Sequence, residues 1–385
     1  MAQAGFHNTL DATDAAAWDR LCGDDNPFVS HAFLAGLERH GCIRAEAGWQ
    51  PHHLLVHEAG ELVAAAPLYL KTNSHGEFVY DWSWAQAWAA HGLDYYPKLL
   101  CAVPYSPVCG PRLLVGSGAR AATLRALLVE LIRDEARRLR LSSAHLNFAN
   151  DADAAACTGH AWLARTGWQF HWRNDAGWQR FDDYLGALSH HKRNNIRRER
   201  AQVAAAGVRC EIRHGDELDD ADWCALHEFY LATFDAKGNH PALTEEFLRH
   251  LGRSLPRQVV AVLCRRNGHA IAGALLLRSS TTLYGRYWGA REHVPGLHFE
   301  ACYYQGIDYC LREGLARFEP GAGGEHKVAR GFLPVATHSF HWIADPALRE
   351  AVARALQRET PLLDQYHAQL LAHSPYAQRT PQAHA

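Results

Sequence analysis

The sequence predicts an α+β protein of two similar halves, each a mixed, mostly antiparallel sheet flanked by helices. Three observations support this fold class. A hairpin-like stretch occurs twice, at residues 54–71 and 261–278; a long helical pattern follows each copy; and strand and helix patterns mix within each half. Because hairpin strands pair antiparallel, we expect two α+β layers that lie side by side.

The two hairpin-like stretches match in register. Each is an apolar run, a short polar turn with glycine, and a second run of small and branched apolar residues. Gly60 matches Gly268, and residues 63–66 match residues 271–274. The shared register predicts an internal duplication.

Helical patterns flank each hairpin. Short patterns precede the hairpins at residues 31–41 and 244–255, and long patterns follow at residues 120–141 and 298–314. Gly314 suits the C-terminal cap of the last of these. The apolar positions of the long patterns share one helical face: Leu124, Leu127, Leu128, Leu131 and Ile132 in the first, and Phe299, Cys302, Tyr303, Gly306, Ile307, Cys310 and Leu311 in the second.

These patterns predict a first domain at residues 1–180 and a second at 181–373, with the hinge near residues 172–185. A final helical pattern begins at Pro346, and we expect a flexible tail at residues 374–385.

Composition excludes several functional classes. The 385 residues are 48% hydrophobic and carry a formal net charge of −2, so no global attraction to nucleic acid is expected. The sequence shows no secretory signal pattern and no apolar stretch of about eighteen residues, so we expect no membrane span. The ten cysteines form no C-x-x-C pair. We therefore expect a cytoplasmic protein with reduced thiols and no metal site.

Residues 182–206 predict a basic helix, capped by Asp182 and ended by Gly207. Its apolar face also carries Lys192 and Glu199, which are costly to bury unless they pair or meet a ligand. The other predicted positions are an apolar face of Leu185, Leu188, Ile196 and Val203 and an adjacent stripe of Arg193, Arg197 and Arg200. The arginine stripe has two possible roles. It is either a solvated surface or part of an anion site, in which Lys192, Arg193 and Arg197 bind phosphate.

Residues 321–332, GAGGEHKVARGF, form what we call the glycine loop. It is not a Walker A loop, because Val328 follows the lysine where Ser or Thr is needed to hold magnesium. It is not a dinucleotide fingerprint either, because a strand-like pattern follows instead of a helix. Glu325 and His326 can move protons, while Lys327 and Arg330 supply cations. The alternative is a tight turn with solvated charges.

His298 and Glu300 stand where the last long helix begins, and a helix start favours bound anions. Alternate spacing on a helix does not bring His298, Glu300 and Cys302 together as metal ligands, so no metal is expected there.

Several long phrases, among them KRNNIRRER, LHFEACYYQGIDY and GAGGEHKVARGFLP, resemble the FemAB-like group of the GNAT (Gcn5-related N-acetyltransferase) superfamily. The group is usually described as peptidoglycan biosynthesis or recognition proteins. The resemblance extends over residues 26–374 and implies tandem GNAT-like domains.

The resemblance also implies an N-acyltransferase. Fem proteins transfer an amino acid from aminoacyl-tRNA to the amine of a peptidoglycan precursor, and GNAT enzymes move an acetyl group from acetyl-CoA to an amine. We therefore expect no permanently bound cofactor, acyl-CoA or charged tRNA as co-substrate, and a small-molecule or peptide amine as acceptor. The GNAT pyrophosphate loop is matched only by Arg291 and Gly296, without its spacing.

In this scheme Lys327, which resembles the lysine of the Fem pattern, meets a donor phosphate or the oxyanion. Glu325, His326 or His298 accepts the amine proton, and Arg286 and Tyr287 orient the substrate.

Two other functions remain open. A non-catalytic protein of the same fold would recognise peptidoglycan precursors through the aromatic stretch YDWSWAQAW. An RNA-binding protein would use the arginine helix, but the near-neutral charge and the lack of an RNA-binding signature disfavour it.

Overall fold

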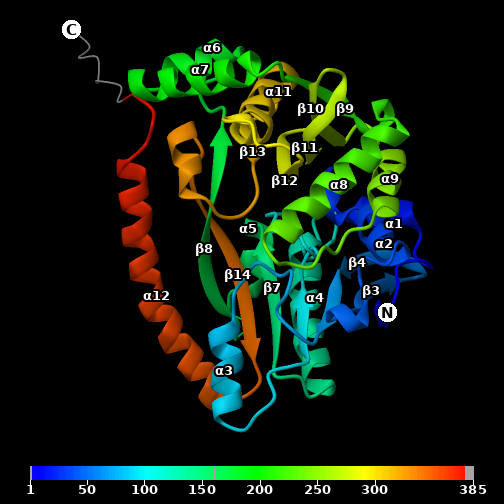
Figure 1. Ribbon diagram of the computed structural model, residues 1–385. Helices are drawn as coiled ribbons and strands as arrows, with labels where there is room; N and C mark the ends of the chain where they lie inside the picture. The colour runs from blue at the N-terminus through cyan, green and yellow to red at the C-terminus, as the bar shows by residue number, and fades with distance from the viewer. Residues whose placement is uncertain (1, 160, 378–385) are drawn as a thin grey trace. The chain divides into compact units, whose positions relative to one another are not determined.

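A computed structural model describes residues 2–159 and 161–377, which fall into two compact units (Figure 1). The first unit takes in residues 1–168, 242–255 and 336–364, and the second takes in residues 169–241, 256–335 and 365–385. Both units combine helices with mostly antiparallel strands, which confirms the predicted α+β class.

The first unit contains two groups of strands. A three-stranded sheet has the order β1-β3-β4, and a second group has the order β2-β5-β6-β7-β14, in which β6 and β7 are parallel. The strands are β1 (Ala2–His7), β2 (Trp49–Pro51), β3 (His53–Glu58), β4 (Glu61–Ala66), β5 (Leu68–Lys71), β6 (Lys98–Cys101), β7 (Ser143–Ala149) and part of β14 (Leu333–Ile343). The helices are α1 (Ala15–Leu21), α2 (His31–Arg39), α3 (Trp82–Ala90), α4 (Ala121–Arg138), α5 (Asp151–Cys157), α9 (Glu245–Ser254) and most of α12 (Pro346–Ala372).

The second unit has the strand order β8-β13-β12-β11-β10-β9, in which β12 and β13 are parallel. The strands are the end of β8 (Leu163–Arg173), β9 (Arg209–His214), β10 (Val259–Arg266), β11 (His269–Arg278), β12 (Thr282–Ala290) and β13 (Arg317–Glu319). The helices are α6 (Phe181–Ala187), α7 (His190–Ala205), α8 (Asp220–Ala236), α10 (Leu297–Phe299), the π-helical turn η4 (Glu300–Tyr304), α11 (Gln305–Glu313) and the 3₁₀ segment η5 (Glu325–Arg330).

The two predicted hairpins, β3–β4 and β10–β11, share more than an apolar pattern. Gly60 and Gly268 have φ angles of 86° and 82°, and the residue before each also has a positive φ, as a type I′ turn requires. Each hairpin also has a bulge at the matching place, after Val56 on β3 and after Cys264 on β10. Turn type, bulge and register therefore all support a tandem arrangement.

The unit boundary differs from the predicted boundary at residue 180. The last residues of β8 already pair with β13 of the second unit, with Trp172 opposite Phe318. Conversely, the end of β14 pairs with β7 of the first unit, and Figure 1 shows these two strands side by side. Helix α9 also belongs to the first unit, because Phe247 packs edge-to-face on Phe33 of α2. Each unit is thus completed by elements from the other half of the sequence, which a hydrophobic pattern cannot show.

The basic helix is two helices rather than one. Its backbone is extended at Leu188 and Ser189, between α6 and α7. The reason is tertiary: Ser189 N–H donates to the Pro375 carbonyl, and Ala377 N–H donates to the Ala187 carbonyl. Asp182 lies inside α6 and is not the cap, which is Arg180. The predicted apolar face is correct, since Leu185, Leu188, Ile196 and Val203 are buried, and Gly207 follows the end of α7.

These contacts also hold the first residues of the predicted tail. Besides the backbone bonds, the Tyr376 hydroxyl donates to the Gly331 carbonyl, and its ring stacks on Trp178. The rest of that tail, residues 378–385, lies outside the described residues.

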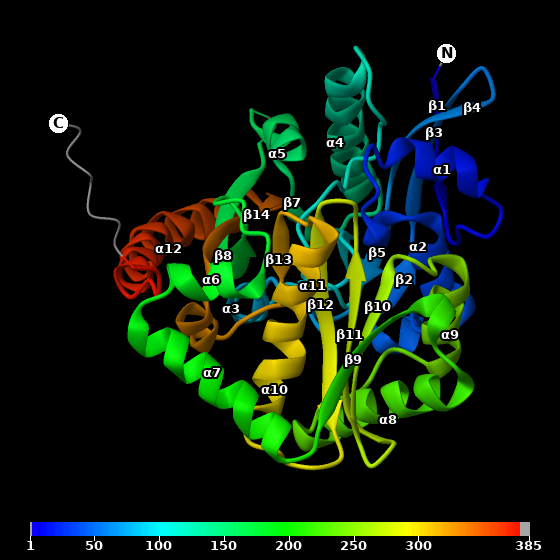
Figure 2. The same ribbon diagram turned by 90° about the horizontal axis from the view of Figure 1, so that it is seen from above.

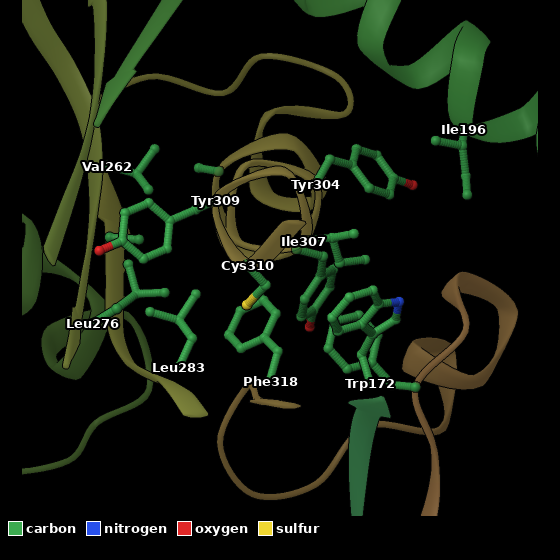
Figure 3. Packing of buried hydrophobic residues seen from close by; sticks show 14 of the residues in the cluster. Trp172, Ile196, Val262, Leu276, Leu283, Tyr304, Ile307, Tyr309, Cys310 and Phe318 are labelled. Atoms are coloured by element: carbon green, nitrogen blue, oxygen red, sulfur yellow. The ribbon is translucent and has the colours of Figure 1, made fainter. Parts of the chain in front are cut away.

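The second unit buries apolar side chains on both faces of its sheet, and one large cluster lies on the face that α10 and α11 cover. Figure 2 shows β9–β12 side by side, with α8 along one side and the segment from α10 to α11 along the other. Ile307 and Cys310 point into this cluster beside Trp172 and Phe318, Tyr309 faces Val262 and Leu276, and Tyr304 points toward Ile196 (Figure 3). The predicted helix face is therefore a core face, and Gly314 ends α11 with a φ of 68°.

Within residues 2–159 and 161–377, no helix has both the length and the apolar character needed to cross a membrane.

Candidate functional site

The candidate site lies where β12 and β13 stop pairing. The recorded pairs end at Tyr284 opposite Glu319, although β12 continues for six residues, from Gly285 to Ala290. A Cβ on Gly285 would lie 3.2 Å from the Pro320 Cα, so only glycine lets the two backbones come so close before they diverge. Arg286 lies in a bulge of β12, because Tyr287 pairs with Leu275 and Gly285 with Leu276.

The glycine loop connects β13 to β14, as the sequence predicts. Gly321, Gly323, Gly324 and Gly331 all have positive φ angles, so the chain turns sharply into and out of η5. This geometry places His326 on the surface and buries Lys327 and Arg330.

His326 is exposed and has a defined partner. Its Nε2 lies 2.9 Å from the Tyr303 hydroxyl, and its ring lies near those of His298 and Phe299. Burial and the neighbouring cations Lys327 and Arg330 lower the pKa of His326. The imidazole is therefore neutral at pH 7 and can accept a proton.

Lys327 does not face solvent. Its side chain is buried, and Nζ donates to the carbonyls of Gly321, at 2.7 Å, and Ala322, at 3.4 Å. Burial lowers the pKa of Lys327 to about 8. The ammonium thus closes the glycine loop on itself, and it offers at most one further donor to a ligand.

Arg330 ties three elements together. Its guanidinium donates to the Tyr304 hydroxyl at 2.9 Å, to Glu199 Oε1 at 2.7 Å and to the His326 carbonyl at 3.0 Å. It also lies 3.3 Å from the centre of the Phe299 ring. Glu199, on the apolar face of α7, is therefore paired with Arg330, which resolves the cost of placing a carboxylate there.

His298 and Glu300 take different positions. His298 is half-buried beside Trp288 and Tyr303, and burial, then His326, lowers its pKa to about 4. Glu300 is buried and accepts from Arg200 at 3.1 Å and from Gln305 at 2.7 Å. His298 thus adjoins His326, whereas Glu300 is occupied by protein donors.

The other predicted side chains lie outside the group around His326. Glu325 is exposed and accepts from the Tyr366 hydroxyl. Arg286 packs over the Tyr287 ring, and that ring meets Tyr230 of α8. On α7, Lys192 and Arg193 are half-buried and Arg197 is exposed; none of the three has a side-chain partner recorded among residues 2–159 and 161–377.

Sequence reasoning missed several neighbours of the loop. Tyr303 was expected only on the apolar face of the helix, and no role was predicted for Tyr304. The π-helical turn that presents their hydroxyls has no simple sequence signature, although such turns are frequent at functional sites. His171 on β8 was also missed: it is buried, and its Nε2 lies 3.0 Å from Gln169 Oε1. Burial and nearby cations, including Lys327, lower the pKa of His171 to about 3.

Comparisons with known proteins agree with this fold. The family profile FemAB-like, described as peptidoglycan biosynthesis/recognition, matches residues 9–378. The C-terminal domain of a protein described as a lysylphosphatidylglycerol synthetase from Agrobacterium fabrum has a TM-score of 0.53 at 14% identity, covering 91% of this chain and 97% of that one. FemX has a TM-score of 0.51 at 11% identity, covering 82% of this chain and 93% of that one. A comparison with curated proteins found no match.

Proposed function

Because the chain belongs to the FemAB-like family of peptidoglycan biosynthesis/recognition proteins, we propose that it transfers an acyl group, acetyl or aminoacyl, to an amine of a cell-wall precursor. One observation carries this proposal. His326 is exposed, has a lowered pKa and is hydrogen-bonded to Tyr303, and it adjoins His298, which contacts Trp288 on the part of β12 that is not paired with β13.

In this reaction the acceptor amine attacks the carbonyl carbon of the donor and loses a proton. The proton goes to Nδ1 of His326 in the tautomer whose Nε2–H donates to the Tyr303 hydroxyl oxygen. Burial raises the pKa of Tyr303, so the phenol stays neutral and keeps this orientation. Tyr303 is thus a positioning residue for the base.

The cations take separate roles. Lys327 holds the loop through Gly321 and Ala322 and directs its remaining N–H toward the oxyanion of the tetrahedral intermediate. Arg330 fixes η5 against α7 and η4. Lys192, Arg193 and Arg197 bind phosphates of the donor, which both acyl-CoA and aminoacyl-tRNA carry.

The test begins with a calorimetric titration of the full chain with acetyl-CoA, followed by the same titration with charged tRNA. The donor that binds is then assayed with a panel of amines that includes peptidoglycan-precursor peptides. We expect His326→Ala to lower kcat by about 10²- to 10⁴-fold, as the loss of a general base does. His269→Ala, at an exposed position of β11, is the matched control and leaves kcat unchanged. Equal kcat values for the wild-type and His326→Ala proteins would exclude His326 as the base.

A second candidate function, recognition without catalysis, rests on a different observation. Of the aromatic stretch in the first unit, Trp84 and Trp88 are buried, but Tyr80 and Trp82 are 58% and 53% exposed. Their ring centres are 5.0 Å apart, and such a pair can stack on sugar rings. Binding of a muropeptide that is lost in Trp82→Ala, with no donor consumed, would favour this function over acyl transfer.

A further inference from the structure

A pair of thiols lies on neighbouring strands of the second unit. Cys210 is the second residue of β9, and Cys264 stands directly opposite it on β10. Their Sγ atoms are 3.3 Å apart. Cys264 is buried, whereas Cys210 is half-buried on the strand that ends the sheet order of this unit.

This geometry suits a disulfide. Directly opposed residues of an antiparallel pair have Cα atoms about 4.5 to 5.5 Å apart, within the range of about 4.4 to 6.8 Å that a disulfide spans. Bond formation requires the two sulfurs to approach from 3.3 Å to about 2.05 Å, which rotation about the two Cα–Cβ bonds can supply. No group of three or more metal-ligating side chains is found in the described part of the chain, so the pair is not part of a recognisable metal site.

We propose that Cys210 and Cys264 form a reversible disulfide when the protein meets a hydroperoxide. Solvent reaches Cys210, so its sulfur attacks the peroxide first: an S–O bond forms, the O–O bond breaks, and water or an alcohol leaves. The sulfur of Cys264 then displaces the hydroxyl group, which leaves as water with the thiol proton, and the S–S bond forms. Two thiols lose two electrons, and the peroxide gains them.

The bond has a structural consequence. It joins positions 54 residues apart, and cross-linking a loop of that size restricts the unfolded chain. Cys210 also lies only a few residues after α7, the helix whose Glu199 holds Arg330. Oxidation therefore links β9, the strand that directly follows α7, covalently to β10. The reduced protein lacks this bond. The inference does not depend on the acyl-transfer reaction.

The experiment treats the reduced full chain with low equivalents of hydrogen peroxide, alkylates the remaining thiols and maps the tryptic peptides by mass spectrometry. We expect residues 210–213 to be joined to residues 258–265, with the loss of two hydrogen atoms and with full reversal by dithiothreitol. The oxidised protein melts at a higher temperature than the reduced protein.

Two controls keep the test decisive. Cys224 is exposed on α8 of the same unit and has no sulfur partner recorded in the described residues, so it oxidises without joining either peptide. The variant Cys210→Ser, at a half-buried position, loses both the joined peptide and the rise in melting temperature. Oxidation of Cys224 with no joined peptide in the wild-type protein, or a joined peptide that pairs Cys264 with Cys302, would overturn the proposal.

Discussion

Each unit contains a cluster of ionisable side chains, and the two clusters differ in exposure. In the first unit Lys98 is fully buried and bonds to Glu77 at 2.8 Å and to Asp81, both of which are buried as well. In the second unit His326 and Glu325 of the glycine loop reach solvent. The first cluster is thus closed within the protein, and the second exposes part of its charged side chains.

The closed network of the first unit extends through neutral groups. The Tyr95 hydroxyl donates to Asp81 and lies 3.3 Å from His145 Nε2, while the Nδ1 atoms of His145 and His341 are 2.7 Å apart. Burial lowers the pKa of His341 to about 3 and also lowers that of His145, so both rings are neutral and share a single N–H between them. Every member has a protein partner, which suits a structural network rather than a binding site.

The comparison teaches that a cluster of charges among apolar residues does not by itself indicate a site. The two clusters look alike in sequence, since each combines lysine, acidic and histidine side chains with aromatic residues. The second cluster differs from the first in two respects: it is exposed, and one reactive atom, Nδ1 of His326, has no hydrogen-bond partner recorded among residues 2–159 and 161–377.

The largest effect is expected at Lys98. Lys98→Met leaves two buried carboxylates without their cation, and breaking a buried pair from one side costs about 3–5 kcal/mol. That is a large share of a typical unfolding free energy of about 5–15 kcal/mol. Urea unfolding followed by tryptophan fluorescence measures it. Arg120→Met, which removes an exposed pair with Glu58 in the same unit, is the control and leaves the midpoint unchanged. Equal midpoints for both variants would mean that the network does not stabilise the first unit.

A somewhat smaller loss of stability is expected for Gly289→Ala, at the place where β12 meets α8. A Cβ added at Gly289 would lie 1.8 Å from the Phe229 carbonyl oxygen, so the helix and strand backbones must separate. Overpacking of this kind costs about 1–3 kcal/mol or more. Gly186→Ala is the matched control: nothing lies within 4 Å of its added methyl group, and it stands in α6. Alanine there raises stability by up to about 1 kcal/mol. Opposite signs for the two variants in urea unfolding are the expected result.

The exposed cluster, unlike the closed one, predicts a pH profile for kcat/KM. The pKa of His326 lies below its usual 6.5, so the base is neutral and active above that range and is protonated at acid pH. Lys327 carries its charge below about 8 and loses it as the pH rises through that value. If the charge of Lys327 is needed to stabilise the oxyanion, kcat/KM falls about tenfold per pH unit above 8.

Lys327→Arg tests the assignment of that alkaline limb. Arginine keeps its charge to about pH 12, so the limb near pH 8 disappears in this variant. Lys192→Arg on α7 is the control and leaves the limb in place. A limb near pH 8 that persists in Lys327→Arg would assign it to a different group.

Local features were predictable from the sequence, and long-range partners were not. The hairpins followed from two apolar runs on either side of a turn glycine, Gly60 or Gly268, and these signals act within a few residues. The division of the basic helix did not, because its cause is the bonding of residues 187–189 to residues 375–377. The same holds for the site: the loop was identified by its glycines, but the burial of Lys327 and the contact of His326 with Tyr303 depend on packing.

The smallest effect concerns what the two units share. Gly60 and Gly268 occupy the same position of a type I′ turn, with φ angles of 86° and 82°, and no atom lies within 4 Å of a Cβ added to either. Alanine therefore costs only the left-handed backbone conformation, about 1–2 kcal/mol at each site. Gly118→Ala, equally open but without a positive φ, is the control and does not lower stability. Equal losses of unfolding free energy for Gly60→Ala and Gly268→Ala, measured by urea unfolding, would show that the turn contributes equally to stability in both units. Unequal losses would mean that the two turns contribute differently to stability, and then the two units differ in their frameworks as well as in their charged clusters.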